Sequence, residues 1–574
     1  MQKEIFYRIS FPEKQAHYCE IEITLKENKS PEIIFSMPVW APGSYLIREF
    51  SRNVDNVYAE SAEGKILLTE KLSKNTWKVS AEGESEFTFR YRVYCNELTV
   101  RTSCVNSEHA FISSSGVFMF AEGMQDCRCT LEIDMPHEWS SVSTGMDRVS
   151  ENTFTAENYD VFIDSPLEIG NQTILEFSIN GVSHYICLAG KGNYDGDKLV
   201  NDFRKIAEEQ IKFFGGEILY RHYTYIINLV EKGGGGLEHL NSFAVQIPRL
   251  NFSDKKLYNK FLGLVSHEFF HLWNVKRIRP VELGPFDYNK ENYTRGLWVA
   301  EGWTSYFDNV FIRRAGLIND EDYFGFLAHE YNDVMRFSGR YHQSLADSSF
   351  DAWIKFYRKD ENYNNTQISY YTKGALVALI LNLEIIKNTD GKRCLDDAMR
   401  ILYDDFRRDS SKGYTQQRIR EVCEAVNGRD IDEFWEKYVE GKDELPMEEY
   451  LDLAGLKVED TADSAQSFLG IESRTENGNL VITKVLAGGS AYISGLNFKD
   501  EIISMDGYRV NENNAKNILS GKKTGDTVKF IVGRDGLIKE INVILAEPFP
   551  MFEVKRKETV TDNQEKIFSK WIYG

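Results

Sequence analysis

The sequence predicts a multidomain α+β protein, and three observations support this fold class. The chain has 574 residues, enough for several domains with separate hydrophobic cores. Residues 1–170 show the apolar–polar alternation of strands. Apolar spacing then becomes helical, and turn-rich strands return after about residue 460. We therefore expect a β-rich domain over 1–170, a mainly helical domain over 171–455, a small β-rich module over 460–548 and a tail over 549–574.

The first domain is predicted from strands such as the one over residues 87–95. Its apolar side chains alternate with polar ones, as in a strand that buries one face. Short strands with Gly, Asn and Ser turns precede and follow it, which favours a sandwich or a large open sheet. We find no convincing catalytic cluster here, so we expect this domain to have a structural role, such as walling one side of a substrate cleft.

The middle domain is predicted to be helical and to carry the chemistry. One helix follows an apolar face from Leu199 to Phe213 and is closed by Gly215. Further helical segments are expected over 254–275, 298–314, 321–336 and 371–387. Ser253 is the expected N-cap of the helix over 254–275. Basic residues before Pro280 suit the carboxyl end of this helix, because that end of the helix dipole is negative.

The most informative motif of the middle domain is His267-Glu268-Phe269-Phe270-His271. On a helix, His267 and His271 lie one turn apart on the same face, where two imidazoles can reach one metal ion. Glu268 lies beside them, placed to accept a proton from metal-bound water. The alternative is a core helix whose two histidines are merely hydrogen-bonded.

A third ligand is needed, and Glu301 is the candidate. The metzincin pattern would require Gly at 274 and His at 277, where this chain has Asn274 and Arg277. Glu301 lies in an apolar segment, where a carboxylate is costly unless a cation compensates it. Two histidines and one glutamate leave a fourth zinc position open for water. The alternative is an ion pair between Glu301 and Arg295 or Arg313.

One further residue could support the metal site, and two further segments fit an aminopeptidase. Asp308, two helical turns after Glu301, is a candidate acceptor for the second ring N–H of a ligand histidine, or else an exposed helix aspartate. The bare backbone of Gly235 and Gly236 can approach a peptide closely, and Glu238 can hold its α-amine; the alternative is a flexible turn with an incidental acid. A tyrosine before the apolar helix over 371–387 can donate to an oxyanion, although core packing is the usual role.

The composition of the chain and its first residues indicate which partners and which cellular compartment to expect. The net charge of −20 argues against nucleic acid and against an anionic membrane surface. No apolar run approaches the ~20 residues of a transmembrane helix. The start of the chain shows no signal peptide, and the eight cysteines are scattered apart from Cys127 and Cys129. We therefore expect a cytoplasmic, reduced protein, an exported form with a trimmed signal being the alternative.

Five ordered motifs resemble the glycyl aminopeptidase-like, PDZ-containing zinc metallopeptidases of the gluzincin group, distant relatives of aminopeptidase N and thermolysin. The resemblance covers essentially the whole chain. The motifs are residues 37–45 (MPVWAPGSY), 235–239 (GGLEH), the metal helix through 273–277 (WNVKR), 298–302 (WVAEG) and 370–375 (YYTKGA).

The resemblance implies an N-terminal β domain, a thermolysin-like catalytic domain and a C-terminal PDZ domain. It implies one zinc ion per chain, bound by His267, His271 and Glu301, with Glu268 as general base and acid. Glu238 would anchor the free amino terminus of a peptide substrate, and Tyr371, with Tyr370 as the fallback, would stabilise the oxyanion. The activity implied is removal of N-terminal residues, with glycine and alanine favoured.

The PDZ resemblance has residues of its own. Phe468, Leu469, Gly470 and Ile471 resemble the loop that receives a peptide carboxylate, and residues 488–507 carry the strongest stretch of the pattern, with Lys499 in place of the usual glycine. Such a groove binds an extended chain as an added strand. Its ligand could be a substrate, a partner or the chain's own tail.

Two other functions compete with an aminopeptidase. One is a zinc endopeptidase that uses the PDZ groove to capture unfolded chains, which would still cut a substrate with a blocked amino terminus. The other is a catalytically silent peptide-binding adaptor. The intact Glu268 argues against the adaptor, because an inactive scaffold needs no base beside its metal.

Overall fold

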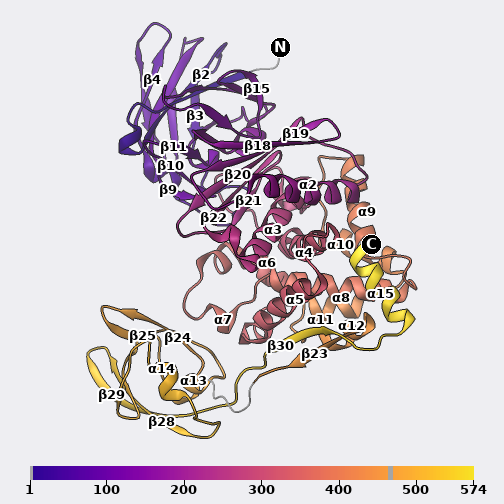
Figure 1. Cartoon of the computed structure of the whole chain (residues 1–574). Coiled ribbons are helices and arrows are strands. Elements are labelled where there is room, and N and C mark those ends of the chain that lie inside the picture. Colours follow the sequence, from indigo (N-terminus) through magenta and orange to yellow (C-terminus); the bar gives the residue numbers. More distant parts are fainter. Residues whose placement is uncertain (1–3, 463–468) are drawn as a thin grey trace. The chain divides into compact units, whose positions relative to one another are not determined.

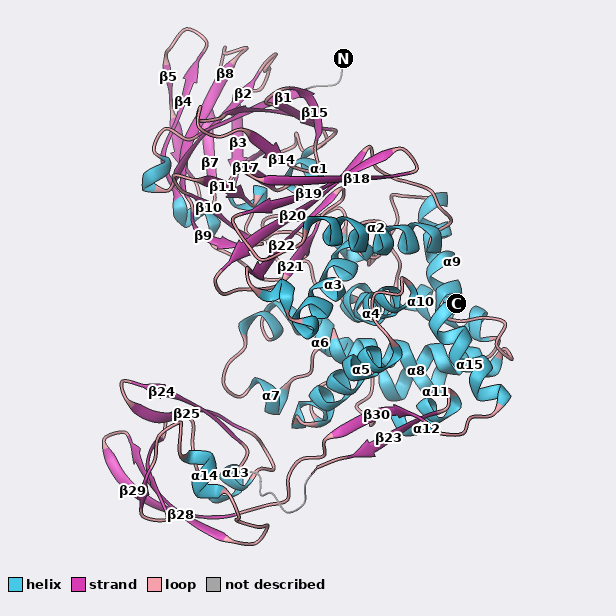
Figure 2. Cartoon of the chain, in the orientation of Figure 1, coloured by secondary structure: helices cyan, strands magenta, loops and turns pink. Residues whose placement is uncertain are grey.

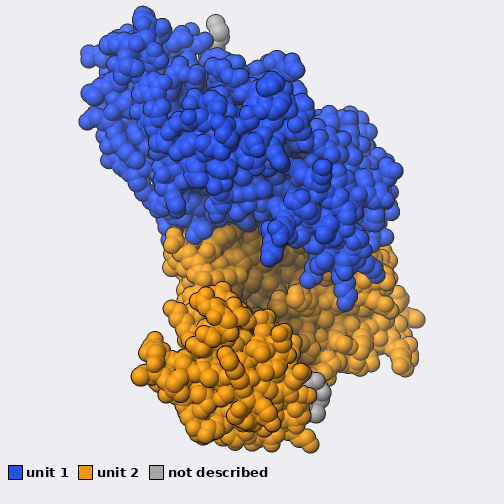
Figure 3. All heavy atoms as spheres, turned by 60° about the vertical axis from the view of Figure 1, so that its left-hand side comes forward, with its two compact units in different colours: residues 1–293, 314–317, 403–414 blue, residues 294–313, 318–402, 415–574 orange. Residues whose placement is uncertain are grey.

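The computed structural model describes residues 4–462 and 469–574. The chain divides into two compact units, coloured separately in Figure 3. Unit 1 comprises residues 1–293, 314–317 and 403–414, and unit 2 comprises residues 294–313, 318–402 and 415–574. Strands dominate the first part of the chain, helices the middle, and strands return near its end (Figure 2). This order confirms the predicted α+β fold class.

Unit 1 begins with β-sheets around one aromatic-rich core. The largest sheet has the order β15-β16-β13-β1-β2-β8-β4-β5, and its β1 and β13 are parallel. The predicted strand at 87–95 is β8, whose burial alternates as expected, and Phe89 stacks on Phe35 with ring centroids 4.2 Å apart. The strands are β1 (Glu4–Ser10), β2 (Tyr18–Leu25), β3 (Glu32–Ser36), β4 (Val54–Ser61), β5 (Ile66–Leu67), β6 (Thr69–Lys71), β7 (Thr76–Ser80), β8 (Phe87–Tyr94), β9 (Asn96–Thr99), β10 (Thr102–Val105), β11 (His109–Ile112), β12 (Phe120–Ala121), β13 (Arg128–Asp134), β14 (Ser141–Ser143), β15 (Asp147–Ser150), β16 (Thr153–Ala156) and β17 (Leu167–Gly170), with helix α1 (Tyr159–Ile163).

A second part of unit 1 is a mixed sheet with two helices, visible in Figure 1. Its order is β18-β19-β20-β22-β21, with β19, β20 and β22 parallel and β21 at the edge. The prediction of a shift to helix from residue 171 missed these strands. The elements are β18 (Thr173–Ile179), β19 (Val182–Ala189), α2 (Gly196–Phe213), β20 (His222–Val230), β21 (Gly236–Glu238), β22 (Ser242–Pro248) and α3 (Lys255–Phe270).

Unit 2 is helical around the apolar helix α8, which is buried along most of its length. A π-helical turn over Trp298–Trp303 leads into α4, matching the helix predicted over 298–314. The helices of this part of the chain are α4 (Thr304–Arg314), α5 (Asp320–Met335), α6 (Leu345–Phe350), α7 (Tyr363–Thr366), α8 (Thr372–Asn388), α9 (Leu395–Arg408), α10 (Gln416–Asn427), α11 (Asp432–Tyr438) and α12 (Met447–Leu453). Of these, Arg314 of α4 and residues 403–408 of α9 belong to unit 1. Among the described helices, none combines the length and the apolar character needed to cross a membrane.

The C-terminal part of unit 2 holds a small β module and a tail. The module's sheet has the order β24-β25-β26-β28-β29. Its elements are β24 (Ile471–Glu476), β25 (Asn479–Val485), α13 (Ser490–Ser494), β26 (Glu501–Met505), β27 (Tyr508–Arg509), α14 (Ala515–Leu519), β28 (Thr527–Arg534) and β29 (Leu537–Ile544). Before and after the module in the sequence, β23 (Leu456–Asp460) pairs with β30 (Phe552–Arg556), and α15 (Asp562–Tyr573) packs on α8 and α12.

Candidate active site

Helix α3 carries the histidine motif, with bounds that differ from the prediction. The side chain of Asp254, not of Ser253, caps the helix by accepting a hydrogen bond from Leu257 N at 2.9 Å. The helix ends at Phe270 with His271 at its C-cap, rather than at residue 275. Turns follow because Leu272 N and Trp273 N donate to carbonyls three residues back. The rings of His267 and His271 still meet, with centroids 4.6 Å apart.

His271 is oriented by the backbone of the turn that follows the helix. Its Nδ1 lies 2.6 Å from the carbonyl oxygen of Asn274, which can only accept a hydrogen bond. The proton therefore lies on Nδ1, and Nε2 keeps the lone pair that a metal requires. The sequence did not predict this contact, because the partner is a backbone atom whose place depends on where the helix ends.

Glu268 packs directly against the backbone of the glycine-rich segment. Glu268 is 4% exposed. A Cβ built on Gly236, the first residue of β21, would lie 2.0 Å from Glu268 Oε1. The absence of a side chain at Gly236 therefore leaves room for the Glu268 carboxylate. The sequence predicted a different role for this glycine, the close approach of its backbone to a peptide. Its carbonyl accepts a hydrogen bond of 3.1 Å from Arg101 Nη2, another contact that the sequence did not reveal.

Glu238, at the other end of β21, is 3% exposed and lies against Gly43. A Cβ on Gly43, which has φ +85°, would lie 2.4 Å from Glu238 Oε1, so only glycine allows the loop of residues 40–45 to come this close. Glu238 Oε1 has no hydrogen-bond partner among the residues that the structure describes. The ligand atoms of Glu238, Glu268 and His271 all lie within 4.8 Å of one another.

Unit 2 places Glu301 in the π-helical turn, where it is 1% exposed. The predicted alternative for Glu301 does not occur. Arg295 pairs with Asp347 at 2.6 Å, and Arg313 pairs with Asp320 at 2.7 Å. A buried carboxylate in an apolar segment requires compensation by a cation or by hydrogen bonds.

Tyr371 lies at the N-cap of α8, next to Glu301 within unit 2. The π-helical turn and α8 pack backbone to backbone, since a Cβ on Gly302 would lie 2.7 Å from the Cα of Gly374. Burial, and then the charge of Glu301, raise the pKa of Tyr371 well above its usual value, so its hydroxyl keeps its proton. Tyr371 is half-buried, whereas Tyr370 is 0% exposed and packs in the core.

Asp308 is buried on α4, so the alternative of an exposed helix aspartate does not hold. Its contact with a ligand histidine stays a prediction.

In the β module, Phe468 lies outside the described residues. Leu469 O and Gly470 O accept hydrogen bonds from Ala491 N (2.9 Å) and Leu486 N (2.8 Å), and Ile471 begins the edge strand β24.

Comparison with known families identifies the domains of the chain. A Peptidase M61 N-terminal domain model matches residues 6–171, an M61 glycyl aminopeptidase model matches residues 260–377, and a PDZ domain model matches residues 467–545. A crystal structure of an aminopeptidase N family protein from Idiomarina loihiensis is 32% identical with a TM-score of 0.92, covering 99% of this chain and 100% of that chain. This chain belongs to the M61 peptidase family. It is therefore a peptidase that carries a PDZ domain, as the motifs predicted.

More distant structures share less with the chain. An M1 zinc metallopeptidase mutant from Deinococcus radiodurans is 13% identical with a TM-score of 0.48, over 78% of this chain and 95% of that chain. Legionella pneumophila aminopeptidase A in complex with aspartic acid is 12% identical with a TM-score of 0.47, over 76% of this chain and 49% of that chain. No curated protein matches the sequence.

Proposed function

We propose that this M61 peptidase is a zinc-dependent aminopeptidase that removes one residue at a time from the free amino terminus of a peptide. The observation that carries the proposal is the buried, unpartnered carboxylate oxygen of Glu238 in the same small cluster as Glu268 and His271. In a peptide, the amine nitrogen is only about 2.5 Å from the carbonyl carbon of its own residue. An amine held at Glu238 therefore leaves only the first peptide bond within reach of Glu268.

The residues present fit a zinc ion, and we propose one per chain, held by His267, His271 and Glu301. His271 offers Nε2 because its Nδ1 donates to Asn274 O. Glu301 offers a buried carboxylate from the π-helical turn. Two imidazoles and one carboxylate form a catalytic rather than a structural ligand set. When bound, zinc would polarise the scissile carbonyl and acidify the attacking water.

The chain's own residues supply the remaining steps. Glu268 accepts the proton of the attacking water and then donates it to the leaving amine. Tyr371 donates a hydrogen bond to the oxyanion, because it keeps its proton and is less buried than Tyr370. The edge strand β21 aligns the peptide backbone, while Glu238 sets the register. Asp308 would orient His267, as Asn274 O orients His271.

The PDZ domain would hold a second peptide segment. Its edge strand β24 can pair with an extended chain, and the loop at Leu469 and Gly470 would receive the terminal carboxylate. The chain's own tail does not fit this role. It forms α15, where Trp571 and Ile572 are fully buried, and a PDZ ligand must be extended. We therefore propose a substrate or partner peptide as the ligand.

The test is cleavage of one defined peptide in two forms, with a free and with an acetylated amino terminus, followed by mass spectrometry. We expect stepwise loss of N-terminal residues from the free form alone. Activity should disappear after chelation and return with one zinc per chain, measured by elemental analysis. Internal cleavage of the acetylated peptide would show an endopeptidase, and no cleavage of either form by the zinc-loaded protein would favour the adaptor.

A further inference from the structure

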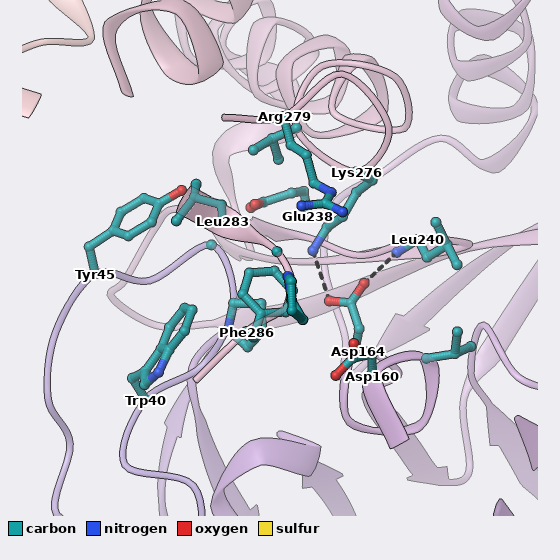
Figure 4. A pocket seen from close by; sticks show the side chains of 16 residues that line it. Trp40, Tyr45, Asp160, Asp164, Glu238, Leu240, Lys276, Arg279, Leu283 and Phe286 are labelled. Atoms are coloured by element: carbon teal, nitrogen blue, oxygen red, sulfur yellow. Dashed lines mark hydrogen bonds and ion pairs between the residues drawn. The ribbon is translucent and has the colours of Figure 1, made fainter. Parts of the chain in front are cut away.

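A pocket in unit 1 adjoins Glu238 and is not used by the chemistry described above. Its volume is about 170 Å³, roughly ten times what a single water molecule needs. Figure 4 shows Glu238 among the residues that line it. Its apolar walls come from the loop of residues 40–45, from α1 and from the segment after α3: Trp40, Tyr45, Val161, Leu283, Pro285 and Phe286.

The other charged groups of this pocket balance in number, two acids against two bases, although Arg279 Nη1 has no hydrogen-bond partner among the described residues. Lys276 Nζ lies 2.8 Å from Asp164 Oδ1, and Leu240 N donates to Asp164 Oδ2 at 2.9 Å, as drawn in Figure 4. Asp160 accepts a hydrogen bond from the hydroxyl of Tyr288, and the positive charge of Arg279 stabilises the ionised carboxylate of Asp160. Glu238 is thus the acid of the pocket with a buried oxygen that no described residue satisfies. A substrate amine would satisfy it, and the rest of the pocket would remain neutral and largely apolar.

The pocket is held in shape before any ligand arrives. Trp40 Nε1 donates to Asp287 O at 2.8 Å, and Val39 N donates to Tyr288 O at 2.9 Å. These bonds join the start of the loop of residues 40–45, and the residue before it, to the segment after α3, and Gly43 lets that loop contact Glu238. The sequence motif of residues 37–45, which had no chemical role, therefore builds a wall of this pocket. A rigid apolar wall discriminates by side-chain size.

The side chain of a substrate's first residue starts two bonds from its amine, so it is about 2.5 Å from the atom that Glu238 would hold. We propose that this pocket receives that side chain and favours a large apolar or aromatic residue, such as phenylalanine, leucine or methionine, over glycine and alanine. The inference rests on the proposed aminopeptidase function and on Glu238 as the amine anchor. It departs from the glycine and alanine preference that the family resemblance implies, because a residue with little or no side chain would leave the cavity unfilled.

The test compares kcat/KM on arylamides of phenylalanine, leucine, alanine and glycine, using the full-length zinc-loaded protein. We expect the phenylalanine and leucine substrates to exceed glycine by about tenfold or more, since each methylene in an apolar pocket changes the rate by that order. Val161→Phe should fill the pocket and lower the phenylalanine-to-glycine ratio by about tenfold. Val149→Phe is the matched control, because Val149 is 64% exposed and does not line the pocket; its ratio should match the unmodified protein.

A second measurement needs no variant, so it decides the matter even if Val161→Phe fails to fold. Free phenylalanine, as a product, should inhibit at about tenfold lower concentration than free glycine. Preference for glycine and alanine, or equal inhibition by both products, would overturn the inference while leaving the aminopeptidase proposal intact. Failure to hydrolyse any arylamide or free peptide would instead overturn the proposed function, and this inference with it.

Discussion

At the scale of single residues, glycines shape the candidate site as much as charged groups do. Gly43 and Gly236 each occupy a place where a Cβ would meet the carboxylate of a site acid, Glu238 in one case and Glu268 in the other. The absence of a side chain is therefore what lets both acids stay buried and close together. Substitution at these glycines tests the geometry without touching a charged group.

Gly236→Ala should disable the site with a modest effect on folding. The new Cβ would lie 2.0 Å from Glu268 Oε1 and would displace the carboxylate. A displacement of about 1 Å in a catalytic group costs on the order of 10²-fold, and we expect kcat to fall by that amount. Gly234→Ala is the control in the same segment, because nothing lies within 4 Å of its Cβ. Equal kcat for both variants would show that the position of Glu268 does not limit the reaction.

Substitutions of the two adjacent tyrosines should differ in their effect on kcat. Tyr371→Phe removes the proposed oxyanion donor, so we expect kcat to fall by about 10²–10³-fold with little change in KM. Tyr370→Phe alters a fully buried hydroxyl and should change stability more than turnover. Kinetics on one arylamide and thermal unfolding of both variants make the comparison. If Tyr370→Phe showed the larger loss of kcat, the assignment would have to be exchanged.

The sequence predicted part of this arrangement. It selected Glu238, Glu268 and His271, and the structure brings these three together. It could not predict which site residues Gly43, Arg101 and Asn274 contact. Gly43 and Arg101 lie far away in the chain, and Asn274 acts through its backbone carbonyl. Side-chain chemistry marks a residue in a sequence, but packing partners and backbone donors become visible only in the fold.

At the scale of elements, the helix that carries the histidines has a well-defined start. Asp254→Ala should destabilise the protein by about 0.5–2 kcal/mol, because the amide of Leu257 would lose its acceptor. Ser253→Ala should cost less, since the hydrogen bond that Ser253 Oγ accepts comes from the exposed side chain of Asn193 and not from a backbone amide of the helix. Urea unfolding of both variants measures the difference. A larger cost at Ser253 would restore the cap that the sequence predicted.

Among the strands that the sequence missed, β20 and β22 are buried along most of their length, whereas β18 is largely exposed. In β20, seven successive residues are buried, so the apolar–polar alternation that identified β8 is absent. Such a run cannot be told from a buried helix by periodicity alone. The long helices α5 and α8 were predicted within one residue of their bounds, because their apolar spacing and flanking residues both indicated helix.

At the scale of the whole molecule, a buried histidine should make stability depend on pH. His184 is 0% exposed on β19; its Nδ1 lies 2.8 Å from the Tyr225 hydroxyl and its Nε2 lies 3.1 Å from the Tyr220 hydroxyl. Burial lowers the pKa of His184 from 6.5 to about 3. Between these values the unfolded chain binds a proton that the folded chain does not. His184 therefore does not lower the free energy of unfolding above pH 6.5, and it lowers that free energy progressively as the pH falls toward 3.

We expect the unmodified protein to lose stability relative to His184→Gln by up to about 1.4 kcal/mol per pH unit across this window. Urea unfolding of both proteins at pH 7, 5 and 4 measures the difference. His137→Gln is the control, because the side chain of His137 is 99% exposed. Parallel pH profiles for the unmodified protein and His184→Gln would show that His184 becomes protonated without unfolding.

The central claim is that a zinc-bound site hydrolyses the peptide bond and that Glu268 is the proton acceptor. The most direct test measures the turnover of Glu268→Gln at known zinc content. This variant keeps the size of the side chain and the glycine contact but removes the base. We predict one zinc per chain, as in the unmodified protein, and a fall in kcat of about 10²–10⁴-fold on a free-amine peptide. Glu231→Gln, an exposed site outside the cluster, should leave both values unchanged. Full turnover in Glu268→Gln would contradict the account.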